Sequence, residues 1–181
     1  MKRCVTVYCG ASDGLNPAFV EAAWTVGRLL AEAGVEVITG AGATGMMRAV
    51  ADGAMHAGGT VHGIIPRFMV ERGWDYKALT KITVTETIHA RKELMAQLSC
   101  AAIALPGGVG TWEELMEIIT WKQLGLYAGN VAVLNLESYY EPVASLINKG
   151  YENGFIKSDV VNAVTFANTP EDVVKAALKL K

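Results

Sequence analysis

The 181-residue chain has little cysteine, no run of charges of one sign and no long hydrophobic segment. Its three cysteines, Cys4, Cys9 and Cys100, show neither CxxC nor Cys/His metal spacing, so we expect buried, reduced thiols and no metal site. No segment approaches the roughly 18 consecutive apolar residues of a membrane span. The basic pair Lys2-Arg3 is not followed by an apolar stretch of signal-peptide length. These absences predict a cytoplasmic protein that does not bind a membrane.

The charge balance also argues against a nucleic-acid partner. Sixteen Lys and Arg residues against eighteen Asp and Glu residues leave a net charge of -2, and the basic residues are scattered along the chain. The composition, with 51% hydrophobic residues, 19% charged residues and 19 glycines, is typical of a soluble α/β protein. The length suits a single domain over residues 1–181.

Apolar runs of strand length alternate with helical patterns along the chain. Strands are predicted at 5–9, 35–39, 60–65, 82–85, 101–105 and 131–134. Helices are predicted at 17–33, 46–57, 88–99 and 139–148, and from 111 and 169 onward, whereas 67–78 is irregular and 155–156 and 160–166 are extended. This alternation predicts a parallel sheet with helices on both faces. Ligands bind beyond the carboxyl ends of such strands, where loops 10–14, 40–45 and 106–111 should meet.

The most informative segment is the glycine-rich turn from Pro106 to Glu114, with the sequence PGGVGTWEE. It follows a predicted buried strand and precedes an amphipathic helix. Such a turn directs several backbone N–H groups at one point, and the helix N-terminus adds roughly half a positive charge there. The segment therefore predicts a phosphate site with glutamates beside it.

A simpler interpretation of two of these residues stays open. Thr111 and Glu114 have the spacing of a capping box, in which each side chain bonds a backbone amide of the helix N-terminus. A cap of this kind is worth about 1 kcal/mol. It does not explain the three glycines and the proline of the turn, and it is compatible with a glutamate that faces a ligand.

A second glycine loop, Gly40-x-Gly42-x-x-Gly45, matches the dinucleotide-binding fingerprint literally. An NAD site needs an acidic residue about 20 positions later, at the end of the next strand. That strand ends at Pro66-Arg67 without one, although Arg67 leaves NADP open. Close packing of this loop near the phosphate or sugar of another ligand is the favoured interpretation.

A charged cluster, Ile88 to Met95, precedes the strand that leads into the first glycine turn. Its Arg91 and Lys92 lie at a predicted helix start, where the helix dipole favours acidic residues instead. A solvated helix face is the usual explanation of such a run. The unfavourable placement indicates a functional role, while His89 is interpreted as a structural histidine.

Taken together, these motifs resemble the Lonely Guy (LOG) family of cytokinin riboside 5′-monophosphate phosphoribohydrolases. The resemblance rests on the Pro106–Glu114 turn, similar to the family's PGGxGTxxE signature, and on Arg91-Lys92 in an HxRK-type motif. It covers nearly the full length. It implies a Rossmann-like three-layer fold, a homodimer or higher oligomer, and cleavage of a purine nucleoside 5′-monophosphate into free base and ribose 5-phosphate without a cofactor.

The resemblance also implies roles for individual residues. Glu114 would stabilise the ribose cation and orient or activate water, and Arg91 would contact phosphate or ribose and hold the glutamate ionised. The 5′-phosphate would be seated by Gly107, Gly108, Val109, Gly110 and Thr111. Further contacts are expected from Lys92, Glu113, Thr120, Gly42 and Gly45.

Several positions depart from the family pattern and bear on base specificity. Arg48 adds a charge to the second glycine loop, Gly73 stands where the family has an acidic substrate contact, and Ile88 and Ala90 replace residues usual before and after His89. The alternative function is a non-catalytic carrier of a nucleotide or phosphorylated cofactor, since related glycine loops bind such ligands without cleaving them. The apolar helix 115–121 belongs either to the core or to a subunit interface.

Overall fold

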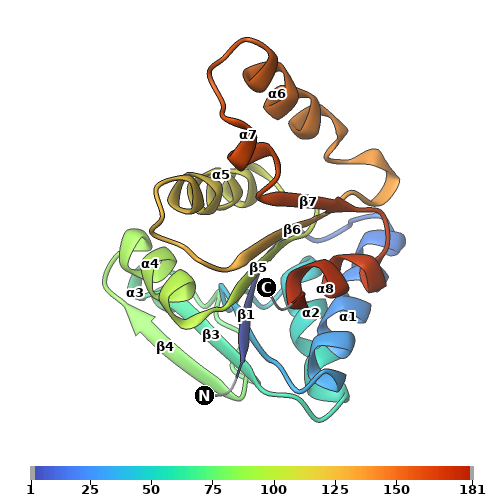
Figure 1. The fold of residues 1–181 in the computed structure, drawn as a ribbon. Coiled ribbons are helices and arrows are strands. Elements are labelled where there is room, and N and C mark those ends of the chain that lie inside the picture. The colour runs from blue at the N-terminus through green and yellow to red at the C-terminus, as the bar shows by residue number, and fades with distance from the viewer. Residues whose placement is uncertain (1–2, 180–181) are drawn as a thin grey trace.

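The computed structural model describes residues 3–179, and its strands form one seven-stranded parallel sheet. In chain order the strands are β1 (Cys4–Tyr8), β2 (Glu36–Thr39), β3 (Val61–Pro66), β4 (Lys81–Thr85), β5 (Ala101–Ala104), β6 (Asn130–Leu134) and β7 (Val164–Ala167). Their spatial order is β4-β3-β2-β1-β5-β6-β7 (Figure 1). β1 therefore lies between β2 and β5, the two strands that lead into the glycine loops.

The helices cover both faces of the sheet, as the alternating pattern predicts. They are α1 (Pro17–Glu32), α2 (Gly45–His56), α3 (Arg67–Glu71), α4 (Ile88–Leu98), α5 (Val109–Gln123), a 3₁₀ turn (Leu136–Ser138), α6 (Glu141–Glu152), α7 (Ser158–Val161) and α8 (Pro170–Leu178). Helices α1, α2 and α8 lie on one face, and α4 and α5 on the other, with α6 and α7 beyond α5 (Figure 1). The three-layer α/β fold is thus confirmed.

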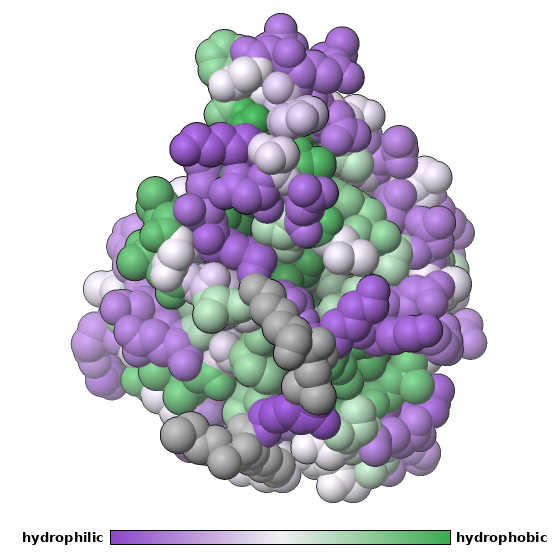
Figure 2. Space-filling view, in the orientation of Figure 1, coloured by the Kyte–Doolittle hydropathy of each residue, from purple (hydrophilic) through white to green (hydrophobic). Residues whose placement is uncertain are grey.

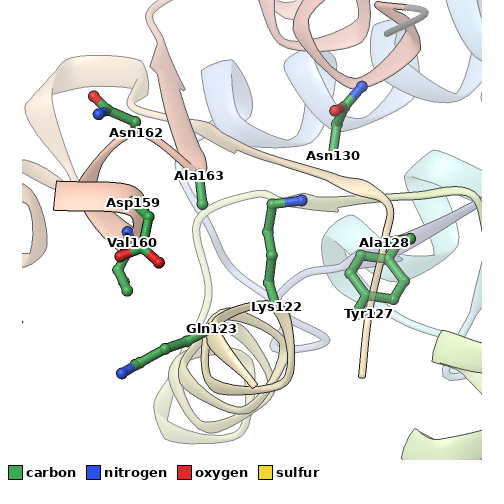
Figure 3. A pocket seen from close by; sticks show the side chains of 9 residues that line it. All are labelled: Lys122, Gln123, Tyr127, Ala128, Asn130, Asp159, Val160, Asn162 and Ala163. Atoms are coloured by element: carbon green, nitrogen blue, oxygen red, sulfur yellow. Dashed lines mark hydrogen bonds between the residues drawn. The ribbon is translucent and has the colours of Figure 1, made fainter. Parts of the chain in front are cut away.

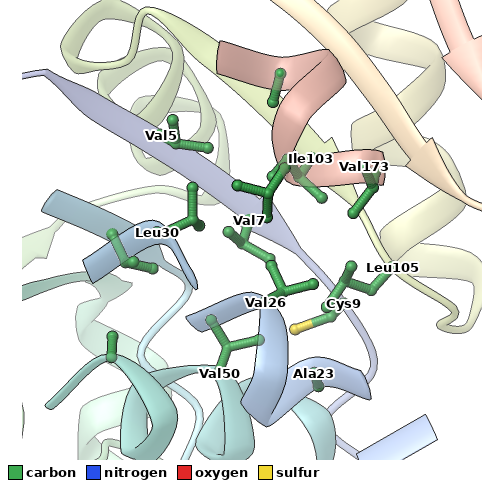
Figure 4. Packing of buried hydrophobic residues seen from close by; sticks show 14 of the residues in the cluster. Val5, Val7, Cys9, Ala23, Val26, Leu30, Val50, Ile103, Leu105 and Val173 are labelled. Atoms are coloured by element: carbon green, nitrogen blue, oxygen red, sulfur yellow. The ribbon is translucent and has the colours of Figure 1, made fainter. Parts of the chain in front are cut away.

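The central strand β1 is buried on both faces, which explains its unbroken apolar sequence. Val5, Val7 and Cys9 pack against α1, α2 and α8 (Figure 4), whereas Tyr8 belongs to a second cluster under α4 and α5. This alternation follows the period of two of a strand. The two cores hold the carboxyl ends of β1, β2 and β5 in fixed positions, and the site is built on those ends.

Several local predictions were wrong. Residues 67–71 form α3, where irregular backbone was expected. Residues 160–161 belong to α7 and residues 155–156 lie in a bend, where extended backbone was expected. Cys100 is exposed rather than buried, because it precedes β5 instead of lying within it; Cys9 is buried, Cys4 is half-buried, and all three are free thiols. No helix within residues 3–179 is long and apolar enough to cross a membrane. The same residues contain no group of three His, Cys, Asp or Glu side chains able to hold a metal ion.

Candidate functional site

The turn after β5 leads directly into α5, which begins at Val109 with Gly108 as its N-cap in extended backbone. No side chain caps this helix, so the alternative interpretation of Thr111 and Glu114 as a capping box, which the sequence left open, is wrong. Thr111 lies instead within the first helical turn and is buried. The first N–H groups of a helix have no carbonyl partner inside it. The amides of Val109, Gly110 and Thr111 are therefore placed to bind an anion.

The turn itself is held from two sides. The Gly10 N–H donates to the carbonyl oxygen of Pro106 at 3.1 Å, and the Tyr139 hydroxyl donates to that of Gly107 at 2.5 Å. A Cβ at Gly107 would lie 2.2 Å from Oγ1 of Thr111 and 2.8 Å from the Gly10 nitrogen. Only glycine fits this approach. The contribution of Tyr139 was not predicted, since no local pattern links a tyrosine to a turn 32 residues earlier.

The second glycine loop lies against the first loop of the chain. The Met47 N–H donates to the carbonyl oxygen of Gly10 at 3.1 Å. Gly45 has a φ of 57°, and a Cβ there would lie 2.4 Å from the Ser12 carbonyl oxygen. Loops 10–14, 40–45 and 106–111 thus meet at the carboxyl ends of β1, β2 and β5, as the topology predicts. Gly45 is required by this packing, and Gly42 lines the neighbouring cleft.

Arg91 and Glu114 form a buried ion pair between the first turn of α4 and the second turn of α5. The Nη2 group of Arg91 donates to Oε1 of Glu114, and the two residues are only 8% and 7% exposed. Burial raises the pKa of Glu114 above its ordinary value, and Arg91 offsets part of that rise. The arginine thus favours the ionised form, as expected, but burial is the larger influence. A carboxylate with a raised pKa is suited to take a proton from water.

Lys92 makes a second connection between the same helices. Its ammonium contacts Glu113 and lies 3.0 Å from an oxygen of Glu117, and its side chain is 5% exposed. Burial lowers the pKa of Lys92, but hydrogen bonds to the two glutamates outweigh burial and the net shift is upward. Both adjacent cations at the start of α4 are therefore neutralised by α5. These ion pairs offset the unfavourable interaction of the two cations with the positive end of the α4 helix dipole.

Thr120, which was predicted as a substrate contact, lies away from the Arg91–Glu114 pair of the same chain. It is exposed on α5, where its hydroxyl donates to the Met116 carbonyl oxygen at 2.8 Å. Six residues separate it from Glu114, which corresponds to about 9 Å along a helix.

A cleft of about 430 Å³ lies next to Arg91, between the second glycine loop and the segment after β3. It is lined by Ala11, Gly40, Gly42, Ala43, Thr44, Met47, Ile65, Met69, Gly73, Trp74 and Arg91. Met69 and Trp74 were missed from the sequence, because 67–78 shows no periodic pattern. The one sequence feature that pointed to this segment was Trp74, which directly follows Gly73, a position that departs from the family pattern.

A different hollow, of about 360 Å³, is drawn in Figure 3. It is lined by Lys122, Gln123, Tyr127, Ala128, Asn130, Asp159, Val160, Asn162 and Ala163. Asn130 begins β6 and Ala163 precedes β7, so this hollow lies at the amino ends of the strands. It contains none of the predicted site residues, and ligands of parallel sheets bind at the opposite edge.

Comparison with known proteins agrees with the motifs. A family model described as "Possible lysine decarboxylase" matches residues 47–177. The chain is 36% identical over 171 residues to a probable cytokinin riboside 5′-monophosphate phosphoribohydrolase of Oryza sativa subsp. japonica, with 94% of this chain and 77% of that protein covered. It is 38% identical over 174 residues to a cytokinin riboside 5′-monophosphate phosphoribohydrolase of Arabidopsis thaliana, with 96% and 80% covered.

Solved structures share the fold at lower identity. A molybdenum cofactor binding protein from Rippkaea orientalis is 23% identical with a TM-score of 0.74, covering 97% of this chain and 94% of that one. The molybdenum cofactor carrier protein of Chlamydomonas reinhardtii is 22% identical with the same TM-score, covering 97% and 96%. At this identity the likeness concerns the fold alone.

Proposed function

Because the chain belongs to the Lonely Guy (LOG) family of cytokinin riboside 5′-monophosphate phosphoribohydrolases, we propose that it hydrolyses the N-glycosidic bond of a purine nucleoside 5′-monophosphate. The products are the free base and ribose 5-phosphate. The observation that carries this proposal is the buried Arg91–Glu114 pair beside the unpartnered amides at the start of α5.

The phosphate is proposed to bind at the N-terminus of α5, on the turn formed by Gly107, Gly108, Val109, Gly110 and Thr111. Backbone amides and the helix dipole there favour an anion. The sugar then lies toward Glu114, whose charge also acts on Tyr8 and Cys9 at the end of β1. In this proposed order the scissile bond lies at Glu114, the one buried carboxylate among residues 3–179, which pairs with the buried Arg91.

Glu114 is proposed to act on water. As the bond between C1′ and the base breaks, its electron pair leaves with the base, and positive charge develops on the ribose. The Glu114 carboxylate stabilises that charge and accepts a proton from the water that bonds to C1′. The nitrogen of the departing base takes up a proton from solvent, and Glu114 returns its own proton to solvent. Arg91 orients the carboxylate and contacts the phosphate or ribose as a forked donor. Lys92 and Glu113 support this pair across the two helices.

Decarboxylation of lysine is a poorer fit to the same residues. That reaction forms a Schiff base between pyridoxal phosphate and a lysine whose amine must lose its proton. Lys92, the lysine beside the proposed site, lies between two carboxylates that raise its pKa. Its ammonium is therefore held in the protonated form that cannot act as a nucleophile.

A homodimer is proposed as the assembly. Val109, Trp112 and Met116 are spaced to lie on one side of α5, and each is at least 36% exposed. Leu124 and Leu126, which follow the helix, are also exposed. A green patch lies at the left of Figure 2, where Figure 1 shows the segment that joins α5 to β6. Exposed apolar patches of this kind mark protein contacts. Thr120, on the same helix, would then face the neighbouring subunit's site.

The three free thiols support a cytoplasmic location.

The test is chromatographic detection of free base from AMP and from isopentenyladenosine 5′-monophosphate, with the matching nucleosides as controls. Release from the monophosphates but not from the nucleosides supports both the reaction and the phosphate site. Binding of the nucleotides without release of base supports the carrier alternative instead.

A further inference from the structure

Two adjacent tyrosines donate hydrogen bonds to the turn between β5 and α5. The Tyr139 hydroxyl donates to the Gly107 carbonyl oxygen at 2.5 Å, and the Tyr140 hydroxyl donates to the Leu105 carbonyl oxygen at 2.8 Å. Both tyrosines follow β6, the strand next to β5, more than 30 residues later in the chain. The two hydroxyls therefore hold the two ends of one short turn from outside it.

The backbone before these tyrosines has an unfavourable conformation. Glu137 and Ser138 have φ values of 52° and 59°, in the left-handed region that a Cβ disfavours. Asn135 closes this bend, because its carbonyl oxygen accepts from the Ser138 N–H at 3.2 Å and its side-chain oxygen accepts from the Tyr140 N–H at 2.7 Å. Such strain persists where the surrounding contacts over-determine it. Here it accompanies the placement of two successive side chains, Tyr139 and Tyr140, on the same turn.

The peptide group between Gly107 and Gly108 is the part of the turn that most needs an external hold. A flip of this peptide changes ψ of the first glycine and φ of the second, and neither residue has a Cβ to oppose it. A Cβ built at Gly108 would have no neighbour within 4 Å, so the space beside it is open. The hydrogen bond from Tyr139 opposes the flip, because it fixes the carbonyl of this peptide.

The same hydrogen bond sets the direction of the Gly108 N–H. In a trans peptide the N–H points to the side opposite the C=O, and Tyr139 holds the Gly107 C=O. Within residues 3–179 no hydrogen bond uses the Gly108 N–H. It therefore joins the amides at the start of α5 that are available to an anion. The Tyr139 hydroxyl cannot itself donate to a phosphate, since its single proton is already given to Gly107.

Tyr140 offers a comparison within the same turn. Its acceptor, the Leu105 carbonyl, belongs to the peptide of Pro106, which has no N–H to direct. Tyr140 and Leu105 are both 0% exposed, so this hydrogen bond satisfies a buried carbonyl. The two hydroxyls thus have separable roles: Tyr140 stabilises the fold, whereas Tyr139 also controls a donor that faces open space.

We propose that Tyr139 is a positioning residue for the 5′-phosphate, whose hydroxyl keeps the Gly107–Gly108 peptide in the orientation that presents the Gly108 N–H to the anion. This inference rests on the proposed phosphate site. It gives a residue outside the glycine-rich turn a role in substrate affinity without contact with the substrate. Loss of the hydroxyl should affect binding of the phosphate group and leave proton transfer at Glu114 intact.

The test is an NMR titration of ¹⁵N-glycine-labelled protein with AMP and with adenosine, which gives both dissociation constants. Tyr139→Phe removes only the hydroxyl and should weaken AMP binding about tenfold, as expected for one hydrogen bond to a charged group. Adenosine, which lacks the phosphate, should bind this variant and the wild-type protein equally. In turnover of AMP, Tyr139→Phe should raise KM by a similar factor and leave kcat unchanged.

The Gly108 amide and a matched variant separate positioning from general stability. AMP, but not adenosine, should shift the Gly108 amide proton downfield in the wild-type protein, and Tyr139→Phe should reduce that shift. Tyr140→Phe should lower the melting temperature more than Tyr139→Phe does, because it leaves a buried carbonyl unsatisfied. It should leave the ratio of the two dissociation constants at the wild-type value.

Three results would overturn the inference: unchanged AMP affinity in Tyr139→Phe, equal losses for AMP and adenosine, or a Gly108 amide that does not respond to AMP in the wild-type protein. An equal change of the affinity ratio in Tyr140→Phe would also contradict it. Failure of the hydrolysis is a separate outcome. A wild-type protein that binds AMP without releasing base counts against the proposed reaction, and the same titrations still decide the role of Tyr139.

Discussion

The ammonium nitrogen of Lys92 on α4 lies 3.0 Å from a carboxylate oxygen of Glu117 on α5, and it also contacts Glu113. The neighbouring Arg91 reaches Glu114 on the same helix. Two adjacent cations thus bind three carboxylates within two turns of α5. This arrangement fixes the distance between the helix starts that carry the proposed catalytic pair. Lys92 is therefore a positioning residue in our account.

Lys92→Met should lower kcat more than it raises KM, because Glu114 would no longer be held in register with Arg91. Its two glutamate partners are 54% and 25% exposed, so their loss of a partner should cost only about 1–2 kcal/mol of stability. Thermal unfolding and steady-state kinetics measure both effects. Lys92→Arg should restore most of the activity. Lys149→Met, at a surface lysine 3.9 Å from Glu152, is the control and should change neither quantity. A Lys92→Met variant with unchanged kcat would contradict the positioning role.

Activity should fall on the acid side at a pH above the usual range of a glutamate. Burial raises the pKa of Glu114, and protonation removes the carboxylate that accepts the proton of water. The active form is therefore lost as the pH falls through that raised pKa. Arg91→Gln should raise the pKa further, since it removes the opposing charge. Titration of the Glu114 carboxyl carbon by NMR measures both values, even in a variant with little activity. A downward shift in Arg91→Gln would be inconsistent with the pair as described.

Gly107→Ala should distort the phosphate site, whereas Gly108→Ala should leave the fold intact. A Cβ at Gly107 would meet Thr111 and the Gly10 nitrogen, but one at Gly108 has no neighbour within 4 Å. We expect Gly107→Ala to cost about 1–3 kcal/mol of stability through overpacking. Chemical unfolding of both variants, together with KM for a nucleoside monophosphate, measures the difference. Equal stability of the two variants would show that the close approach at Gly107 is relieved without strain.

Met116→Lys should weaken the proposed dimer, because it places a charge in the exposed apolar surface of α5. Size-exclusion chromatography with light scattering should show a dimer for the wild-type protein and a larger monomer fraction for the variant. Glu152→Lys changes a charged side chain that is 63% exposed at the end of α6, outside the apolar surface of α5, so it should leave the assembly unchanged. A wild-type monomer at all concentrations tested would rule out the interface.

The sequence was sufficient for the parts of the site that depend on topology. The apolar run before Pro106 and the glycines after it identify a strand–turn–helix unit, and the rule for parallel sheets brings three distant loops together. The same reasoning failed where a tertiary partner competes with a local one. Thr111 and Glu114 have capping-box spacing, but Arg91 from another helix takes the carboxylate, and α5 begins two residues earlier.

Short helices that are stabilised by tertiary contacts also could not be predicted from the sequence. Helix α3 has five residues and α7 has four, too few for a periodic pattern. The adjacent Val160 and Val161 look extended because β-branched residues favour strands, yet Val160 is buried within a helical turn. Met69 and Trp74, which line the cleft beside Arg91, could not be recognised from the sequence for the same reason. These residues adjoin or belong to a short helix in a segment without periodicity.

The most direct test of the central claim is a time course of free-base release by the wild-type protein and by Glu114→Gln, with nucleotide binding measured on both. The Arg67–Glu86 pair is exposed, so Glu86→Gln is the matched control for loss of a paired carboxylate. We predict that Glu114→Gln binds the nucleoside monophosphate with similar affinity and releases base about 10²–10⁴-fold more slowly, while Glu86→Gln behaves as the wild type. Near-normal release by Glu114→Gln would remove the buried carboxylate from the reaction and contradict the account.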